Sequence, residues 1–186
     1  MAAICVFCSG KADAPEHFFE LARAVGRGLA DRGDSLVYGG GGLGMMGALA
    51  TAARAAGVPV TGVIPEGLVR LERAAQDLDE LIVSADLAAR KAIMIERADG
   101  FLILPGGLGT LDELFEVWTT GPQLGLHTKP VVLLDADGFY AGLMAWLREV
   151  SSRGVLRPDL LDAVTIASTV NEALEALGHG GSGGTS

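Results

Sequence analysis

Two carboxylates follow a glycine-rich segment in this sequence, at a spacing that suits chemistry on a phosphorylated ligand. Residues 105–110 read Pro-Gly-Gly-Leu-Gly-Thr and lead into a segment with helical character. The unpaired amides and partial positive charge of a helix start favour an anion, and the Thr110 hydroxyl adds a donor. Glu113 and Glu116 fall on one face of this helix. A carboxylate beside an anion site repels the ligand unless it acts on another part of it, so the pair predicts contact with ribose hydroxyls and an anomeric carbon.

An earlier segment, residues 39–44, reads Gly-Gly-Gly-Gly-Leu-Gly and is a second candidate for ligand binding. Glycine lets the backbone turn sharply and approach a ligand closely, which makes Gly40 and Gly41 candidate binding residues. Gly42, Gly44 and Gly47 satisfy the pattern GxGxxG. No acidic residue ends the next strand, so the dinucleotide-binding fingerprint is incomplete. The alternative is a tight strand-to-helix turn that binds nothing.

Short apolar runs alternate with longer helical segments along most of the chain. This alternation predicts a doubly wound, Rossmann-like α/β fold with a mostly parallel sheet and helices on both faces. Both glycine segments leave a strand and open a helix, so both are expected at the carboxyl edge of the sheet, where such folds bind ligands. Residues 66–79 show no clear pattern. The expected strands are 4–8, 36–38, 60–64, 80–83, 101–104, 130–134 and 165–167, and the expected helices are 15–32, 45–56, 86–98, one ending near 120, 139–152 and 170–177.

Length and composition set the outer limits of the prediction. The 186 residues fit a single domain, expected over 1–178, with a Gly/Ser-rich tail at 179–186. The net charge of −9 and the lack of a basic cluster argue against a nucleic acid polymer as partner. No apolar stretch approaches the roughly 18 residues that span a bilayer. We therefore expect no membrane contact and a cytoplasmic location.

Cysteine and metal chemistry are not expected. Cys5 and Cys8 fall on one predicted strand, where alternation directs their thiols to opposite faces, so they are predicted to be buried thiols rather than a redox pair. His, Cys, Asp and Glu show no ligand spacing, so no metal is expected. No lysine lies in a convincing setting for a pyridoxal cofactor, and no other cofactor is expected.

Two motifs together carry a family resemblance. The segment 105–113 matches PGGxGTxxE, and the first glycine run directly follows Val37-Tyr38. The sequence thereby resembles the Lonely guy (LOG) family of phosphoribohydrolases, which act on cytokinin riboside 5′-monophosphates and were formerly labelled lysine decarboxylases. A third family motif, Met-His-Glu-Arg-Lys, is matched at Arg90 and Lys91 and not at the three preceding positions. The resemblance therefore implies which bond is cleaved, and it leaves the preferred base open.

The resemblance implies a role for each matching residue. Glu113 is expected as the essential carboxylate near the ribose, Arg90 as its catalytic partner, and Lys91 as a substrate-binding residue. The expected phosphate cradle is Gly106, Gly107, Gly109 and Thr110. The family also implies a nucleoside 5′-monophosphate substrate, no metal, and a homodimer.

Two alternative functions remain open at this point. A broader nucleosidase would hydrolyse AMP or other nucleoside monophosphates in salvage. A non-catalytic nucleotide carrier would use the glycine segments for binding alone, although such a carrier has no need of a carboxylate at the ribose. Arg90 also has an alternative, because an arginine on a helix is often a solvated surface residue.

Overall fold

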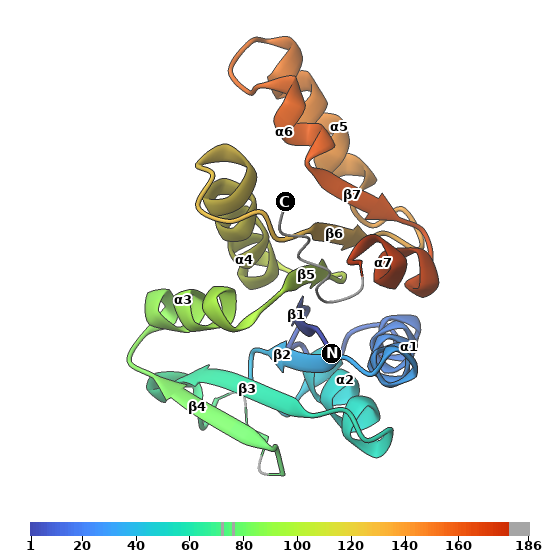
Figure 1. Cartoon of the computed structure of the whole chain (residues 1–186), viewed down its shortest axis with the longest axis vertical. Coiled ribbons are helices and arrows are strands. Elements are labelled where there is room, and N and C mark those ends of the chain that lie inside the picture. The colour runs from blue at the N-terminus through green and yellow to red at the C-terminus, as the bar shows by residue number, and fades with distance from the viewer. Residues whose placement is uncertain (72, 76, 179–186) are drawn as a thin grey trace, which may run out of the picture.

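The computed structural model describes residues 1–71, 73–75 and 77–178, and the predicted tail lies outside these residues. Within them, the strands are β1 (Ala3–Phe7), β2 (Ser35–Tyr38), β3 (Val60–Pro65), β4 (Glu80–Ser84), β5 (Gly100–Ile103), β6 (Val131–Leu134) and β7 (Val164–Ala167). They form one sheet in the order β4-β3-β2-β1-β5-β6-β7, and every neighbouring pair is parallel (Figure 1). The predicted parallel sheet is therefore confirmed.

Helices cover both faces of the sheet, as a doubly wound fold requires. The buried hydrophobic residues of α1 (Glu16–Arg32), α2 (Gly44–Ala55) and α7 (Val170–Ala176) belong to one core cluster. Those of α3 (Leu87–Arg97), α4 (Leu108–Trp118) and α5 (Ala141–Ser152) belong to the other. Shorter helical turns are η1 (Glu66–Leu68), η2 (Thr119–Gln123) and α6 (Pro158–Asp162).

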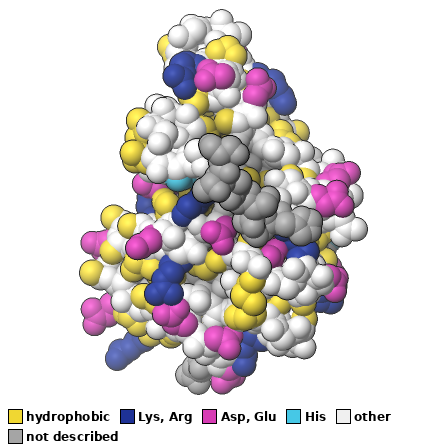
Figure 2. All heavy atoms as spheres, in the orientation of Figure 1, with side chains coloured by type: hydrophobic (Ala, Val, Ile, Leu, Met, Phe, Trp, Pro, Cys, Tyr) yellow, Lys and Arg dark blue, Asp and Glu magenta, His cyan; other side chains and the backbone are white. Residues whose placement is uncertain are grey.

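The surface is charged and mixed in sign. On the face shown in Figure 2, acidic and basic side chains are interspersed with small patches of hydrophobic atoms. No helix among the described residues has both the length and the apolar composition needed to cross a membrane.

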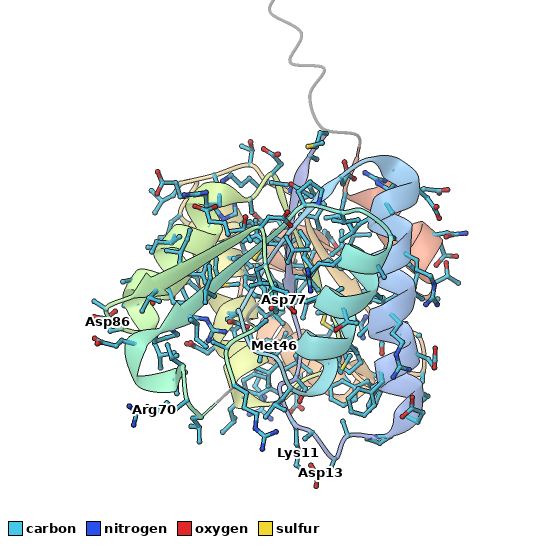
Figure 3. The ribbon with its side chains drawn as sticks, turned by 90° about the horizontal axis from the view of Figure 1, so that it is seen from below. Lys11, Asp13, Met46, Arg70, Asp77 and Asp86 are labelled. Carbon is cyan, nitrogen blue, oxygen red and sulfur yellow. The ribbon has the colours of Figure 1, made fainter. Side chains whose placement is uncertain are left out.

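The order of the strands creates a switch point between β1 and β5. These two strands are neighbours, yet the chain passes from β1 to α1 on one face and from β5 to α4 on the other. Loops that diverge in this way leave a crevice beyond the carboxyl ends of the two strands. Figure 3 shows this edge, with Lys11 and Asp13 projecting from the loop after β1.

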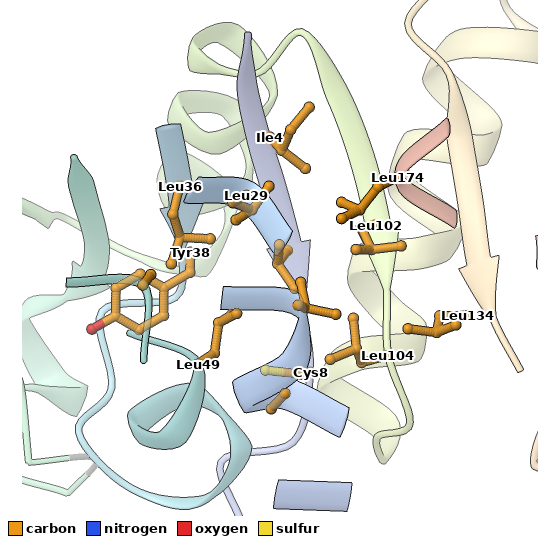
Figure 4. Packing of buried hydrophobic residues seen from close by; sticks show 14 of the residues in the cluster. Ile4, Cys8, Leu29, Leu36, Tyr38, Leu49, Leu102, Leu104, Leu134 and Leu174 are labelled. Carbon is orange, nitrogen blue, oxygen red and sulfur yellow. The ribbon is translucent and has the colours of Figure 1, made fainter. Parts of the chain in front are cut away.

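The core explains why the strands read as continuous apolar runs. Each central strand is covered on both faces, so its side chains are buried whichever way they point. On β1, Ile4 faces the first core cluster and Cys5 faces the second. Figure 4 shows side chains of neighbouring strands meeting Leu29 of α1 and Leu49 of α2. Cys8 lies in the first cluster with Ile4, so the two free thiols are buried on opposite faces, as predicted.

Candidate active site

A cavity of about 210 Å³ lies at the carboxyl ends of β1, β2 and β5. Five of the predicted site residues line it, namely Arg90, Gly107, Gly109, Thr110 and Glu113. The other lining residues are Val6, Phe7, Cys8, Ser9, Gly10, Gly39 and Met46. The fold thus brings the second glycine loop and Glu113, which belong to one segment, and Arg90 of α3 into one cavity.

Arg90 is buried and anchored to the sheet. Asp86 caps α3 by accepting from the Ala89 amide at 2.7 Å, so the helix begins just before the arginine. The Arg90 side chain crosses to the strand ends, where Nε donates to the Val63 carbonyl at 3.0 Å and Nη2 donates to the Gly39 carbonyl at 2.9 Å. Only 7% of Arg90 is exposed, which excludes a solvated surface role.

Glu113 meets the third nitrogen of this guanidinium. Its Oε1 lies 3.8 Å from Arg90 Nη1, and both side chains are almost fully buried. A buried ion pair gains little net stability because desolvation offsets much of the attraction. Burial, and then the Glu113 carboxylate, raise the pKa of Cys8 far above its ordinary value, so Cys8 lines the cavity as a neutral thiol. Because the ion pair of Arg90 and Glu113 gains little stability, it is better explained by function than by folding.

The start of α4 borders the cavity and has the features that favour an anion. Gly107 caps the helix without a side-chain hydrogen bond, and the first amides of a helix have no intrahelical acceptor. Thr110 is 4% exposed in the first turn. A Cβ on Gly106 would fall 2.1 Å from Thr110 Oγ1, whereas one on Gly107 or Gly109 would meet nothing within 4 Å. Gly106 thus makes room for the hydroxyl, and the other two glycines leave space for a ligand.

Comparison with known proteins identifies the family. The profile of a family described as possible lysine decarboxylase matches residues 46–177. A Mycobacterium tuberculosis protein named cytokinin riboside 5′-monophosphate phosphoribohydrolase is 46% identical, over 93% of this chain and 91% of that protein. An Arabidopsis thaliana protein of the same enzyme name is 38% identical, over 94% of this chain and 80% of that protein. The chain belongs to the Lonely guy family.

Solved structures share the fold of this LOG protein. A molybdenum cofactor carrier protein from Chlamydomonas reinhardtii superposes with a TM-score of 0.71 and 26% identity, over 94% of both chains. A molybdenum cofactor binding protein from Rippkaea orientalis gives a TM-score of 0.68 at 24% identity, which shows the common fold alone.

In the first glycine run, Gly39 lines the cavity, and the predicted binding residues Gly40 and Gly41 do not. Gly39, which was not among the candidates, lines the cavity and presses against the arginine, because a Cβ there would lie 2.0 Å from Arg90 Nη2. Gly40 adopts a φ of 73°, which favours glycine. The backbone of Gly41 forms an isolated antiparallel bridge with Ala74. Gly40 and Gly41 do not line the cavity of this LOG protein, and their backbone joins the run to the segment after β3.

Lys91 and Glu116 bind each other at the border of the LOG site. Lys91 Nζ lies 2.9 Å from Glu116 Oε2 and 3.0 Å from Asp112 Oδ1. The hydrogen bond that Lys91 donates to Glu116 is the main reason that the pKa of Lys91 is raised. Neither Lys91 nor Glu116 lines the cavity, so the structure places both as a link between α3 and α4. Gly106 also lies outside the lining of this cavity, and it packs against Thr110.

The loop after β1 completes the site and was missed as a candidate. The Ser9 amide donates to the Pro105 carbonyl at 3.3 Å, and the Met45 amide donates to the Ser9 carbonyl at 2.9 Å. These bonds hold the loops after β1 and β5 and the start of α2 together. The sequence signal is positional, since Ser9 and Gly10 directly follow a buried strand. Within the part of the chain that the structure describes, no cluster of three or more His, Cys, Asp or Glu residues is placed to hold a metal.

Proposed function

We propose that this protein hydrolyses the N-glycosidic bond of nucleoside 5′-monophosphates, including cytokinin riboside 5′-monophosphates, to release free base and ribose 5-phosphate. The observation that carries the proposal is the buried pair of Arg90 and Glu113, 3.8 Å apart, in the same cavity as the phosphate loop. The relatives named as phosphoribohydrolases support the reaction class.

The phosphate is proposed to bind at the start of α4. The amides of the first turn and the Thr110 hydroxyl donate to its oxygens, and the helix dipole favours its charge. This contact is remote from the reacting bond, so its binding energy holds the ribose against the catalytic groups. Glu113 lies one turn further along α4, on the side that faces the cavity.

Glu113 is proposed to act at C1′. Breaking the bond between C1′ and the base builds positive charge on the ribose ring, and a fixed carboxylate stabilises that charge. The same carboxylate accepts a proton from the attacking water, whose oxygen becomes bonded to C1′. The departing base keeps the bonding electrons and takes up a proton, and Glu113 gives up the proton it received, so that water in sum supplies the hydroxyl on C1′ and the hydrogen on the base. Arg90 orients the carboxylate from a guanidinium that is itself fixed to two strand ends.

Lys91 and Glu116 are proposed to support this geometry instead of touching the nucleotide. Their ion pair joins α3 to α4 beside Arg90 and Glu113. This assignment replaces the substrate contact that the sequence suggested for both residues. Gly40 and Gly41 likewise act by shaping the first loop.

We also propose a homodimer. Exposed apolar side chains gather on α4 and the loop after it, where Leu108 and Leu126 are 88% and 73% exposed. Figure 2 shows hydrophobic side chains along the edge of the molecule where α3 and α4 lie. Light scattering at several concentrations tests the proposal, and a monomer at all of them would overturn it.

The reaction is tested by incubating the protein with AMP, N6-isopentenyl-AMP and adenosine and following free base by chromatography. We expect base and ribose 5-phosphate from the monophosphates, with kcat/KM at least about a hundredfold above that for adenosine. Glu113→Gln keeps the size of the side chain and removes its charge, so base release should fall by about a thousandfold or more. Tight binding of AMP with no base released would favour a carrier.

A further inference from the structure

A second cavity adjoins the active-site cavity at the phosphate loop. Its volume is about 250 Å³, and it shares Ser9 and Gly107 with the active-site cavity. Neither Arg90 nor Glu113 lines it. The two cavities therefore adjoin at Ser9 and Gly107, beside the start of α4 where the phosphate is proposed to bind.

The walls of this second cavity, which we call the ester cleft, are mainly apolar. They include Pro15, Phe18, Met45, Pro105 and Phe139. The rings of Phe18 and Phe139 meet edge to face, with centroids 5.6 Å apart. These apolar surfaces favour a neutral apolar or aromatic guest over a hydrated one.

Polar contacts hold the two sides of the cleft in place. His17 Nε2 on α1 lies 3.3 Å from Asp137 Oδ2 on the loop after β6. The Tyr140 amide donates to Asp135 Oδ1 at 3.1 Å, and the Tyr140 hydroxyl donates to the Leu104 carbonyl at 2.6 Å. The loop that carries Phe139 is thus fixed to the end of β5, and the cleft exists before any ligand enters.

Charge at the mouth of the cleft also selects its guest. Lys11 is paired with Asp13 at 3.0 Å, so the one lysine that lines the cleft has a carboxylate beside it. Asp137 adds a further acidic group near Phe139. A second phosphate would meet these carboxylates, and like charges in proximity disfavour binding. The cleft therefore suits a neutral group and not a diphosphate.

We propose that the ester cleft binds the part of a nucleotide that continues beyond its 5′-phosphate, so that the protein also accepts nucleoside 5′-phosphodiesters with an aromatic or apolar ester group. This inference rests on the proposed function. A volume of 250 Å³ greatly exceeds the roughly 30 Å³ that one water occupies, so a ring-sized group fits. The bond broken is again that between C1′ and the base. Water supplies the oxygen on C1′ and a proton for the base, and the phosphate ester stays intact.

The test compares AMP with its 4-nitrophenyl ester, adenosine 5′-(4-nitrophenyl phosphate), as substrates of the full chain. Chromatography follows free adenine from both. We expect kcat/KM for the ester within about threefold of that for AMP. Phe139→Ala should lower kcat/KM for the ester by about tenfold and change that for AMP by less than about twofold. Phe115→Ala, a similarly exposed phenylalanine on α4 outside both cavities, is the matched control and should not separate the two substrates.

A second variant guards against a folding defect. Ala14 lines the cleft, and Ala14→Trp should fill it, blocking the ester while leaving AMP turnover intact. The proposal is overturned if the wild-type protein cleaves AMP but not the ester, or if Phe139→Ala and Ala14→Trp affect both substrates alike. If neither compound is cleaved, the proposed function fails. Calorimetry with the same two ligands then decides the cleft, since only an ester-binding cleft makes ester affinity sensitive to both variants.

Discussion

Lys91 Nζ on α3 lies 2.9 Å from Glu116 Oε2 on α4. Asp112 accepts a second hydrogen bond from the same ammonium group. Arg90 and Glu113 are neighbours of these residues in sequence, so the contact fixes the separation of the two helices beside the catalytic pair. The net stability of such a partly exposed link is modest, about 1 kcal/mol or less. Its larger effect is expected on geometry.

Lys91→Met should therefore reduce turnover more than binding. We expect kcat to fall about tenfold with KM for AMP within about twofold, because small displacements of reacting groups have large effects on rate. Lys91→Arg keeps the charge and should restore most of kcat. Steady-state kinetics on both variants provides the measurement. A rise in KM alone would instead return Lys91 to direct substrate binding.

Removing Arg90 should cost stability as well as activity. Arg90→Ala takes away the donors to the Val63 and Gly39 carbonyls and the cation that faces Glu113. The free energy of unfolding should fall by about 3 kcal/mol, since breaking a buried pair leaves uncompensated polar groups. Urea denaturation measures this change. Glu113→Gln serves as the comparison, with a comparable loss of base release and a smaller loss of stability, and equal stability of Arg90→Ala and wild type would refute the anchoring role.

Adding one methyl group at Gly106 should weaken phosphate binding. The new Cβ would lie 2.1 Å from Thr110 Oγ1 and would displace the hydroxyl from the loop. A hydrogen bond to a charged group contributes about 1.5–3 kcal/mol, so KM for AMP should rise by about tenfold or more. Gly142→Ala on α5 is the matched control, because a Cβ there meets nothing within 4 Å. An unchanged KM in Gly106→Ala would exclude Thr110 from the phosphate site.

Acid should destabilise the fold through His127. Its ring lies against Phe101, with centroids 5.3 Å apart, and burial is the main reason that the pKa of His127 is lowered. Below the ordinary histidine value of about 6.5, the unfolded chain takes up a proton more readily than the folded chain. Stability is thus present above that pH and is lost as the pH falls.

Replacing His127 by Asn should reduce this acid loss. Urea midpoints measured near pH 7 and near pH 5 give the change for each protein, and the variant should lose less between the two conditions. The comparison uses the change and not the absolute midpoint, since the substitution also alters packing under Gly121. An identical loss in both proteins would assign the acid sensitivity to other groups.

Much of the fold follows from local sequence patterns. Helix α1 illustrates this, because the helix expected over 15–32 begins at Glu16, directly after Pro15, and ends at Arg32, with Gly33 in the left-handed region. Hydrophobic periodicity did not predict the structure between β3 and β4, where residues 66–68 form a single 3-10 turn and Ala74 forms a β-bridge with Gly41. That bridge depends on two segments meeting in space, and no local pattern encodes it.

The site was predictable in composition and not in arrangement. The motif that ends at Glu113 named four residues that line one cavity, Gly107, Gly109, Thr110 and Glu113. The destination of the Arg90 guanidinium was not predictable, because β2 and β3 reach it only through the strand order. The sequence also could not show which glycine of the first run lines the cavity, because Gly39 and Gly40 are the same residue type and differ only in their neighbours in space.

The contact between Gly39 and Arg90 joins two positions that are 51 residues apart. Any side chain at position 39 would occupy the space of the guanidinium. A shorter side chain at position 90 would remove the steric requirement for glycine at position 39. The two positions should therefore covary across relatives, being kept together or lost together. Among sequences that retain PGGxGTxxE, we expect those without the pair of Gly39 and Arg90 to include proteins of this fold that bind nucleotides without cleaving them.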